Sequence, residues 1–309
     1  MIRRHPVKSL TLALLALVLA LAFAYVARPT YAVAPTIAPQ PGDSLVVVGV
    51  GGLSWSDVSA ADTPVLWGLL RDGSTANVSV KAMGETTCPT DGWATLGAGE
   101  AAGSGPETEA GTGAGTVTSP PGCGRLPDVS GDASSGFRVS GFEAIAQASL
   151  DGPYRARLGL LGDAFAQTDR CIQAVGPGAA LAAATADGLV SHYAPLQVGT
   201  LLSDLATCPV SLVDIGALTV DPGAQFSPAT PAGQASRASQ ASQVATLDQR
   251  LGQVLRAAPT GADVILVGIS DDETSASSNG SGAGQSGEPG LRVLAATGPH
   301  YPPGTFEST

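Results

Sequence analysis

Strand-length apolar segments alternate with helical segments along this chain, and this alternation limits the fold more than any other feature. Residues 45–50 and 262–270 are short, largely apolar runs that lead into glycine-rich or polar sequence. The clearest helix, residues 241–258, has an apolar stripe of Val244, Leu247, Leu251 and Leu255. Helices that alternate with buried strands are typical of parallel α/β proteins. We therefore predict an α/β fold, a three-layer αβα sandwich with a mostly parallel sheet.

The same patterns divide residues 44–309 into predicted elements. Strands are expected at residues 45–50, 75–83, 171–176, 209–218, 262–270 and 291–297. Helices are expected in the second half of 56–73, in most of 87–99, and at 142–152, 155–167, 179–188, 196–207 and 241–258. Stretches rich in Gly, Ser, Thr and Pro predict mobile loops at 100–136, 221–240 and 271–290. The chain stops soon after the last expected strand, which leaves a truncation at the C-terminus open.

The N-terminus has the pattern of a membrane anchor or an export signal. Basic residues in the first eight positions precede residues 9–27, a run of 19 positions without a charge. That run is long enough to span a bilayer, and the basic residues before it favour a cytoplasmic N-terminus. We expect a signal anchor at 1–28, a Pro-rich linker at 29–43, and an extracytoplasmic domain at the cell membrane. Small residues near Ala34 leave open a cleaved signal peptide and a secreted domain.

Charge excludes one class of partner. The net charge is −11, and lysine occurs only at Lys8 and Lys81. A nucleic-acid-binding surface needs clustered lysine and arginine side chains to neutralise phosphates. We therefore expect no nucleic-acid partner. The partners that remain are the membrane, through the N-terminal helix, and another protein of the cell envelope.

Four cysteines suit disulfides in an exported domain. They are Cys88, Cys123, Cys171 and Cys208, and three pairings of them exist. We favour Cys88–Cys123 with Cys171–Cys208, because each pair brackets one loop-rich segment. A zinc site is the weaker alternative, since the sequence contains no Cys-x-x-Cys spacing.

Three motifs, in this order along the chain, resemble a known enzyme family. They are VVVGVGGL (46–53), TPVLWGLLRDG (63–73) and TTCPTDGWATLGAG (86–99). Together they resemble the opening of the alkaline phosphatase superfamily, especially its nucleotide pyrophosphatase/phosphodiesterase and phosphoglycerate mutase branches. The later segment from LDQRLGQVL to ADVILVGISDDE (247–273) is similar to the superfamily's helix and strand that end in Ser-Asp-His-Gly. The Ala/Gly-rich, Lys-poor composition resembles degenerate, membrane-anchored actinobacterial members.

The resemblance implies roles for individual residues. Thr87 matches the position of the nucleophile, and Asp271 matches the aspartate of Ser-Asp-His. Two positions depart from the pattern. Gly51 stands where the first metal-binding aspartate is expected, and Asp272 stands where a histidine ligand is expected.

Further ligands are few. Asp214 lies at a predicted strand end, but Leu218 stands where an Asp-x-x-x-His motif would place its histidine. In the superfamily that the motifs resemble, zinc is held by several imidazole and carboxylate ligands, whereas histidine occurs here only at His5, His192 and His300. If the domain binds zinc or another divalent metal, the candidate ligands are Asp271, Asp272, Asp214 and His300.

Each assignment has a structural alternative. Thr87 can be a helix N-cap, and Asp271 and Asp272 can be solvated or capping residues at the start of a polar loop. Because the ligand set is incomplete, we predict a catalytically degenerate domain with a binding or envelope-organising role and no cofactor. The alternative is a metal-dependent phosphodiesterase or phosphotransferase with Thr87 as its nucleophile.

Overall fold

A computed structural model describes residues 44–84, 86–104, 123, 125–196, 205–219, 230–271, 291–301 and 303–305. The anchor predicted at 1–28 and the linker predicted at 29–43 lie outside these residues. Among the described residues, no helix is both long enough and apolar enough to cross a membrane.

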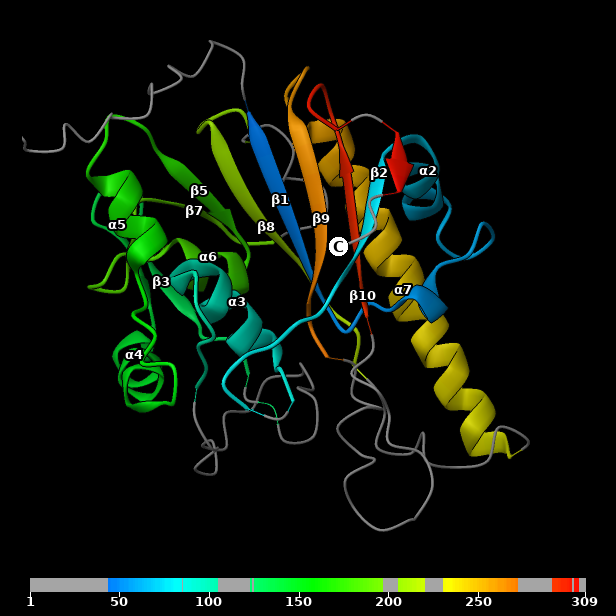
Figure 1. Cartoon of the computed structure of the whole chain (residues 1–309), viewed down its shortest axis with the longest axis horizontal. Coiled ribbons are helices and arrows are strands. Elements are labelled where there is room, and N and C mark those ends of the chain that lie inside the picture. Colours follow the sequence, from blue (N-terminus) through cyan, green and yellow to red (C-terminus); the bar gives the residue numbers. More distant parts are fainter. Residues whose placement is uncertain are drawn as a thin grey trace, which may run out of the picture. The chain divides into compact units, whose positions relative to one another are not determined.

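The described residues form an eight-stranded sheet with the order β11-β2-β10-β9-β1-β8-β5-β7 (Figure 1). Its strands are β1 (Leu45–Gly51), β2 (Ser74–Val78), β5 (Ile172–Val175), β7 (His192–Ala194), β8 (Val210–Ala217), β9 (Asp263–Ser270), β10 (Arg292–Thr297) and β11 (Gly304–Thr305). Strand β10 runs antiparallel to both β2 and β9, and the other neighbouring strands are parallel. The mostly parallel sheet predicted from the sequence is therefore confirmed.

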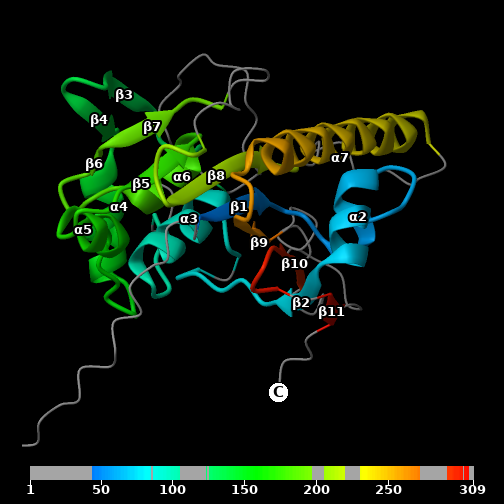
Figure 2. The ribbon, with the colours of Figure 1, turned by 90° about the horizontal axis from the view of Figure 1, so that it is seen from above.

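Helices cover both faces of this sheet. They are α2 (Pro64–Asp72), α3 (Pro89–Ala98), α4 (Phe142–Asp151), α5 (Leu160–Ala166), α6 (Pro177–Ala183) and α7 (Pro231–Ala257), together with the 3-10 helix η1 (Trp55–Asp57). Figure 2 shows α7 and α3 on opposite sides of β1. One apolar cluster joins the sheet to α2 and α7, and another joins it to α3 and α6. The predicted three-layer αβα sandwich is confirmed.

Small residues let α3 and α6 approach the sheet closely. Trp93 of α3 is fully buried, and a side chain on either Gly49 or Gly178 would overlap its ring. A side chain on Gly97 of α3 would meet the backbone of Ala182 in α6. Protein interiors are close-packed, and Trp93, the largest fully buried side chain, fills the space that these small residues leave.

Several predicted boundaries are wrong. Helix α5 begins at Leu160 and not at residue 155, and α6 spans Pro177–Ala183 and not residues 179–188. Helix α7 begins at Pro231, inside the mobile loop predicted at 221–240. The prediction missed this start because the first turns of the helix are rich in Ala, Ser and Gln and carry no apolar stripe. Strand β3 (Val129–Asp132) lies inside the loop predicted at 100–136. Strand β2 ends at Val78, five residues before the predicted strand does.

Other differences concern short elements and undescribed segments. Strand β3 pairs with β4 (Gly136–Val139), which pairs with β6 (Leu189–Val190), in a small antiparallel sheet that the sequence analysis missed. Strands of two to four residues are too short to show an alternating pattern. Residues 105–122, 221–229 and 272–290 of the predicted loops lie outside the described residues, as do residues 197–204 of the helix predicted at 196–207. The described end of that predicted helix, residues 205–207, is not helical.

Both favoured disulfides are present. Cys88–Cys123 and Cys171–Cys208 have Cα–Cα distances of 5.4 and 5.2 Å, which are ordinary values for a disulfide. The predicted pairing is confirmed. Paired cysteines of this kind are typical of proteins that fold in an oxidising compartment.

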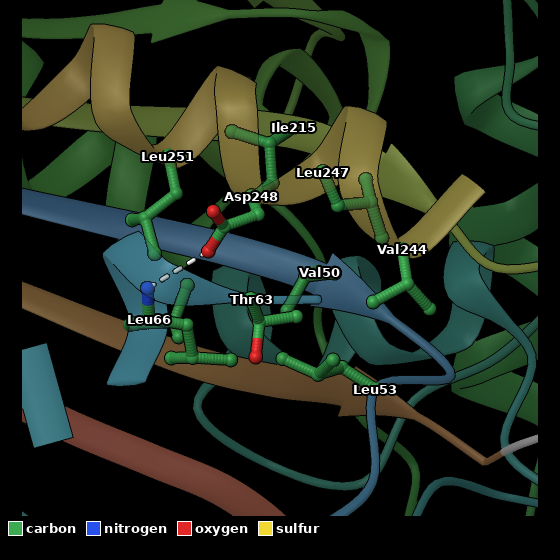
Figure 3. Close-up of a pocket in the computed structure, with 10 residues that line it drawn as sticks. Val50, Leu53, Thr63, Leu66, Ile215, Val244, Leu247, Asp248 and Leu251 are labelled. Carbon is green, nitrogen blue, oxygen red and sulfur yellow. Dashed lines mark hydrogen bonds between the residues drawn. The ribbon is translucent and has the colours of Figure 1, made fainter. Parts of the chain in front are cut away.

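The space enclosed by β1, α2 and α7 is a small apolar cavity with one acid in its lining (Figure 3). Its volume is about 10 Å³, roughly what a single water molecule requires. The acid, Asp248 of α7, accepts hydrogen bonds from the backbone N–H groups of Val65 (3.1 Å) and Leu66 (2.8 Å). Asp248 therefore satisfies the N-terminus of α2, and the cavity is too small for a substrate.

Candidate functional site

The parallel strands β1, β8 and β9 end together at one edge of the sheet, the lower edge in Figure 1. Ligands of open parallel sheets usually bind outside the carboxyl ends of the strands. Gly51 ends β1, and Ser270, its register partner, ends β9. Thr87 comes to the same edge from the segment before α3. The resemblance predicts Thr87 and Asp271 in one site, and the structure brings these two residues together.

Thr87 and Asp271 bind each other through two hydrogen bonds. The N–H of Thr87 donates to Oδ2 of Asp271 at 2.7 Å, and the N–H of Asp271 donates to the carbonyl oxygen of Thr87 at 2.9 Å. Oγ1 of Thr87 accepts a hydrogen bond from the N–H of Ala82 at 3.1 Å, and Thr87 is only 3% exposed. The hydroxyl predicted as a nucleophile is therefore buried and engaged.

The interpretation of Thr87 as a helix N-cap is wrong. The N-cap of α3 is Cys88, and no side-chain hydrogen bond caps this helix. The Thr87 hydroxyl instead accepts the N–H of Ala82 and so fixes the segment that leads into α3.

Arg292 supplies a positive charge beside Asp271. Its Nη2 lies 3.2 Å from Oδ1 of Asp271, with the Arg292 side chain fully buried and the Asp271 side chain 11% exposed. The arginine opens β10 and crosses over Gly268 of β9, where a Cβ atom would lie 2.8 Å from the Cβ of Arg292. Both carboxylate oxygens of Asp271 are thus engaged, Oδ2 by Thr87 and Oδ1 by Arg292.

Gly51 has no room for the aspartate that the resemblance implies. A Cβ atom on Gly51 would lie 2.6 Å from the Cβ of Ala217 and 3.0 Å from Oγ of Ser270. The same Ser270 hydroxyl accepts the N–H of Gly52 at 3.0 Å and holds the turn after β1. Because close-packed neighbours fill this position, an acid at residue 51 would displace β8 or β9.

Asp214 is a buried structural acid. It lies on β8, which β1 separates from β9, and it is 2% exposed. Its Oδ2 accepts the N–H of Gly178 at 2.9 Å, and its Oδ1 accepts the N–H of Gly216 at 2.9 Å. Burial raises the pKa of Asp214, while these two N–H groups and the nearby Arg250 oppose the rise. The structure therefore uses Asp214 to hold α6 on β8 and does not bring it to Asp271.

His300 lies at the opposite edge of the sheet. Its Nδ1 is 2.6 Å from Oδ2 of Asp263, the first residue of β9, whereas Asp271 follows the last. At about 3.3 Å per residue, this strand separates the two positions by more than ~20 Å. Asp272 lies outside the described residues. Of the four predicted metal ligands, only Asp271 is seen at the candidate site.

The described residues at the carboxyl edge do not fit a two-metal site. Such a site needs carboxylate and imidazole groups whose lone pairs are available. Asp271 is ion-paired, and Gly51 carries no ligand. Both histidines within the described ranges, His192 and His300, lie at the amino ends of parallel strands. No zinc-dependent step follows from these residues.

Two residues at this edge escaped the sequence analysis. Arg292 was part of a predicted apolar strand, and the signal that could have revealed it is a lone charge at the start of that strand. Asp91, in the first turn of α3, accepts hydrogen bonds from the N–H of Ser104 (2.8 Å) and from its hydroxyl (3.1 Å). Burial raises the pKa of Asp91, and the bonds from Ser104 oppose the rise. The side chains of both residues therefore bind neighbouring groups of the chain at this edge.

Comparisons with known proteins give structural similarity only. No family model matches the chain, and no curated protein matches it. Among solved structures, it is similar to murine ectonucleotide pyrophosphatase/phosphodiesterase 5, with 11% identity and a TM-score of 0.39 over 74% of this chain and 57% of that one. The human counterpart gives 12% identity and a TM-score of 0.38 over 74% of this chain and 56% of that one. A 2-O GAG sulfatase gives 12% identity and 0.41 over 84% and 64%. The chain spans less than two thirds of each of these structures.

Proposed function

We propose that this chain is a non-hydrolytic domain of alkaline-phosphatase-like fold that acts by binding at the outer face of the membrane. One observation carries the proposal. The carboxylate of Asp271 accepts the N–H of Thr87 on one oxygen and pairs with Arg292 on the other. A divalent metal needs those lone pairs and the negative charge that the guanidinium already neutralises.

Activation of Thr87 also lacks support. A threonine hydroxyl is a weak nucleophile that needs an adjacent base or a metal ion. The described partner of its Oγ1 is a donor, the N–H of Ala82, and the nearby carboxylate of Asp271 binds the Thr87 N–H instead of the hydroxyl. The hydroxyl therefore serves a structural role in this proposal.

The proposed location rests on two features. Both disulfides are formed, which suits an oxidising compartment. Residues 9–27 carry the apolar run and the basic flank of an anchor. In this proposal the anchor holds the domain at the membrane, where it binds another envelope protein. Cross-linking in intact cells, followed by mass spectrometry, would identify that protein.

Metal content and hydrolysis test the proposal together. The full chain is purified in detergent without chelators or reductants, and its zinc and manganese are measured by mass spectrometry. We expect no stoichiometric metal and no hydrolysis of bis(p-nitrophenyl) phosphate. About two equivalents of metal, with turnover that Thr87→Ala abolishes, would overturn the proposal in favour of a phosphodiesterase. Thr246→Ala, which removes an exposed hydroxyl on α7, is the matched control.

A further inference from the structure

A second group of metal-ligand side chains lies at the amino end of the sheet. The Sγ atoms of Cys171 and Cys208 and a ring nitrogen of His192 all lie within 4.8 Å of one another. Among the described residues, no other group of three or more histidine, cysteine or acidic side chains has its potential ligand atoms this close together. It lies at the edge opposite Asp271 and takes part in none of the contacts of the candidate site; its two cysteines form the disulfide described above.

Three neighbouring strands hold this group. Cys171 precedes β5, His192 opens β7 and Cys208 precedes β8, and these strands are adjacent in the order β8-β5-β7. Strand pairing fixes their relative positions, since Gln173 of β5 lies opposite His192 and Ile172 lies opposite Val210. His192 lies on a strand and both cysteines lie within two residues of one, so the sheet restricts the relative positions of the three side chains.

A pocket opens beside this group. It has a volume of about 200 Å³, and both Cys171 and His192 line it. Cys171 and His192 are partly exposed, whereas Cys208 is 2% exposed. No hydrogen bond joins the His192 ring to the part of the chain that the structure describes. The pocket therefore gives small molecules access to the sulfur of Cys171 and to an available imidazole.

The chemistry of the group depends on its oxidation state. As a disulfide, Cys171 and Cys208 offer no thiolate. Two thiols of a reductant break the Sγ–Sγ bond and become a disulfide themselves, and each cysteine sulfur takes up one electron and one proton. A zinc ion then displaces both protons. Tetrahedral zinc with bonds of about 2.3 Å to sulfur and about 2.0 Å to nitrogen holds such ligand atoms ~3.5 to 4 Å apart, which small side-chain movements can reach here.

We propose that reduction of Cys171–Cys208 creates a zinc site whose ligands are Cys171, His192 and Cys208. Two thiolates and one imidazole form a set that zinc binds with the fourth position left for water. The pocket provides the space for that water. This inference is independent of the proposed function, which concerns the oxidised protein and the other edge of the sheet.

Zinc binding by the reduced full chain tests this inference, and the second disulfide is the internal control. The chain in detergent is reduced anaerobically with a phosphine, which competes little for metal, and is titrated with Zn²⁺ and separately with Co²⁺. We expect one equivalent of zinc and thiolate-to-cobalt absorption after reduction, and neither before it. Cys88→Ser/Cys123→Ser should bind like the unmodified chain. His192→Ala should weaken binding at least about tenfold, because one of three ligands is lost.

Three results would overturn the inference. The reduced chain could bind no zinc, His192→Ala could bind zinc as tightly as the unmodified chain, or Cys171→Ser/Cys208→Ser could retain the site. Unfolding on reduction would appear as the second result, because an unfolded chain binds zinc through any of its cysteines without needing His192. The circular dichroism of each reduced variant is recorded beside its titration.

Discussion

The polar side chains at the carboxyl edge of the sheet are bonded to one another, whereas the His192 ring at the amino edge has no bonded partner among the described residues. At the carboxyl edge, Thr87, Asp271 and Arg292 satisfy one another in a nearly closed arrangement. At the amino edge, His192 stands beside a disulfide and a pocket of about 200 Å³, and no described group bonds its ring. Parallel α/β folds usually bind ligands at the carboxyl edge, whereas in this chain the accessible ligand atoms lie at the amino edge.

The difference shows that position in a fold and availability of ligands are separate properties. The carboxyl edge is where parallel sheets place their sites, because strand ends and helix N-termini converge there. In this chain the converging groups are used to hold the edge together. Function has to be argued from free lone pairs and accessible atoms and not from the edge alone.

Removing Arg292 should have the largest effect on the carboxyl edge. Arg292→Leu leaves the Asp271 carboxylate without its cation inside a nearly buried site, so we expect a loss of about 3 kcal/mol in the free energy of unfolding by urea. The matched control is Arg71→Leu, whose ion pair with Asp72 is exposed, and that change should have little effect. Equal losses in the two variants would show that the Arg292 pair does not hold this edge.

Gly51 gives the second largest effect. Gly51→Ala introduces a Cβ atom 2.6 Å from the Cβ of Ala217, and we expect it to cost about 2 kcal/mol. Gly68→Ala, where no atom lies within 4 Å of the new Cβ, should instead stabilise helix α2 by about 0.5 to 1 kcal/mol. Ala217→Gly in the Gly51→Ala background should recover part of the loss. A Gly51→Ala variant of normal stability would mean that the edge can accept a ligand there.

Sequence alone went further with the layers than with the site. The apolar runs that became β1 and β9 were located to within about one residue, because buried parallel strands need continuous apolar sequence. The two disulfides were favoured among three possible pairings because each brackets one loop-rich segment, and both are formed. The start of α7 was missed because Ala, Ser and Gln favour helix without marking a face.

The site depended on contacts between distant parts of the chain. Sequence motifs brought Thr87 and Asp271 together, since both follow from the same resemblance. The partner that neutralises Asp271 is 21 residues away, on a strand of opposite direction, and nothing local to Arg292 indicates it. Likewise, the atoms that exclude a side chain at Gly51 come from Ala217 and Ser270, on two other strands. Pairings of this kind are set by sheet order, which residue patterns do not encode.

Each edge of the sheet carries one disulfide, so the rates at which the two disulfides are reduced can be compared. They close loops of similar length, with sequence separations of 35 and 37, so loop entropy gives each about the same stabilisation, roughly 4 kcal/mol. Access differs, because Cys88 and Cys123 are both buried whereas Cys171 lines a pocket. We expect a small thiol to reduce Cys171–Cys208 about tenfold faster in the folded protein. Alkylation of the freed thiols at timed intervals, followed by peptide mass spectrometry, measures both rates, and a faster Cys88–Cys123 would contradict the comparison.

The smallest effect concerns pH and Asp214. Burial raises the pKa of Asp214, so the folded protein holds a proton over a pH range in which the unfolded chain has already lost it. The contribution of this group to stability is therefore complete below its unfolded pKa of about 3.9 and is lost as pH rises through the folded pKa. The loss is at most about 1.4 kcal/mol per pH unit.

The contribution of Asp214 is separated from that of the other acids by subtracting the stability of an Asp214 variant from that of the unmodified chain at each pH. Asp214→Asn removes the titration and, because an amide has one acceptor oxygen, also leaves the N–H of Gly178 or Gly216 poorly satisfied, at a pH-independent cost of about 1 to 2 kcal/mol. The stability of the unmodified chain minus that of Asp214→Asn should then decline from about pH 4 upward. Asp132 should show the opposite dependence of stability on pH, because hydrogen bonds from Ser134 and Ser135 lower its pKa to about 2. The corresponding difference for Asp132→Asn should fall as the solution becomes more acidic than about pH 4. A flat difference for Asp214 alongside a sloping one for Asp132 would mean that the buried carboxyl keeps an ordinary pKa and that the layer beneath α6 admits water.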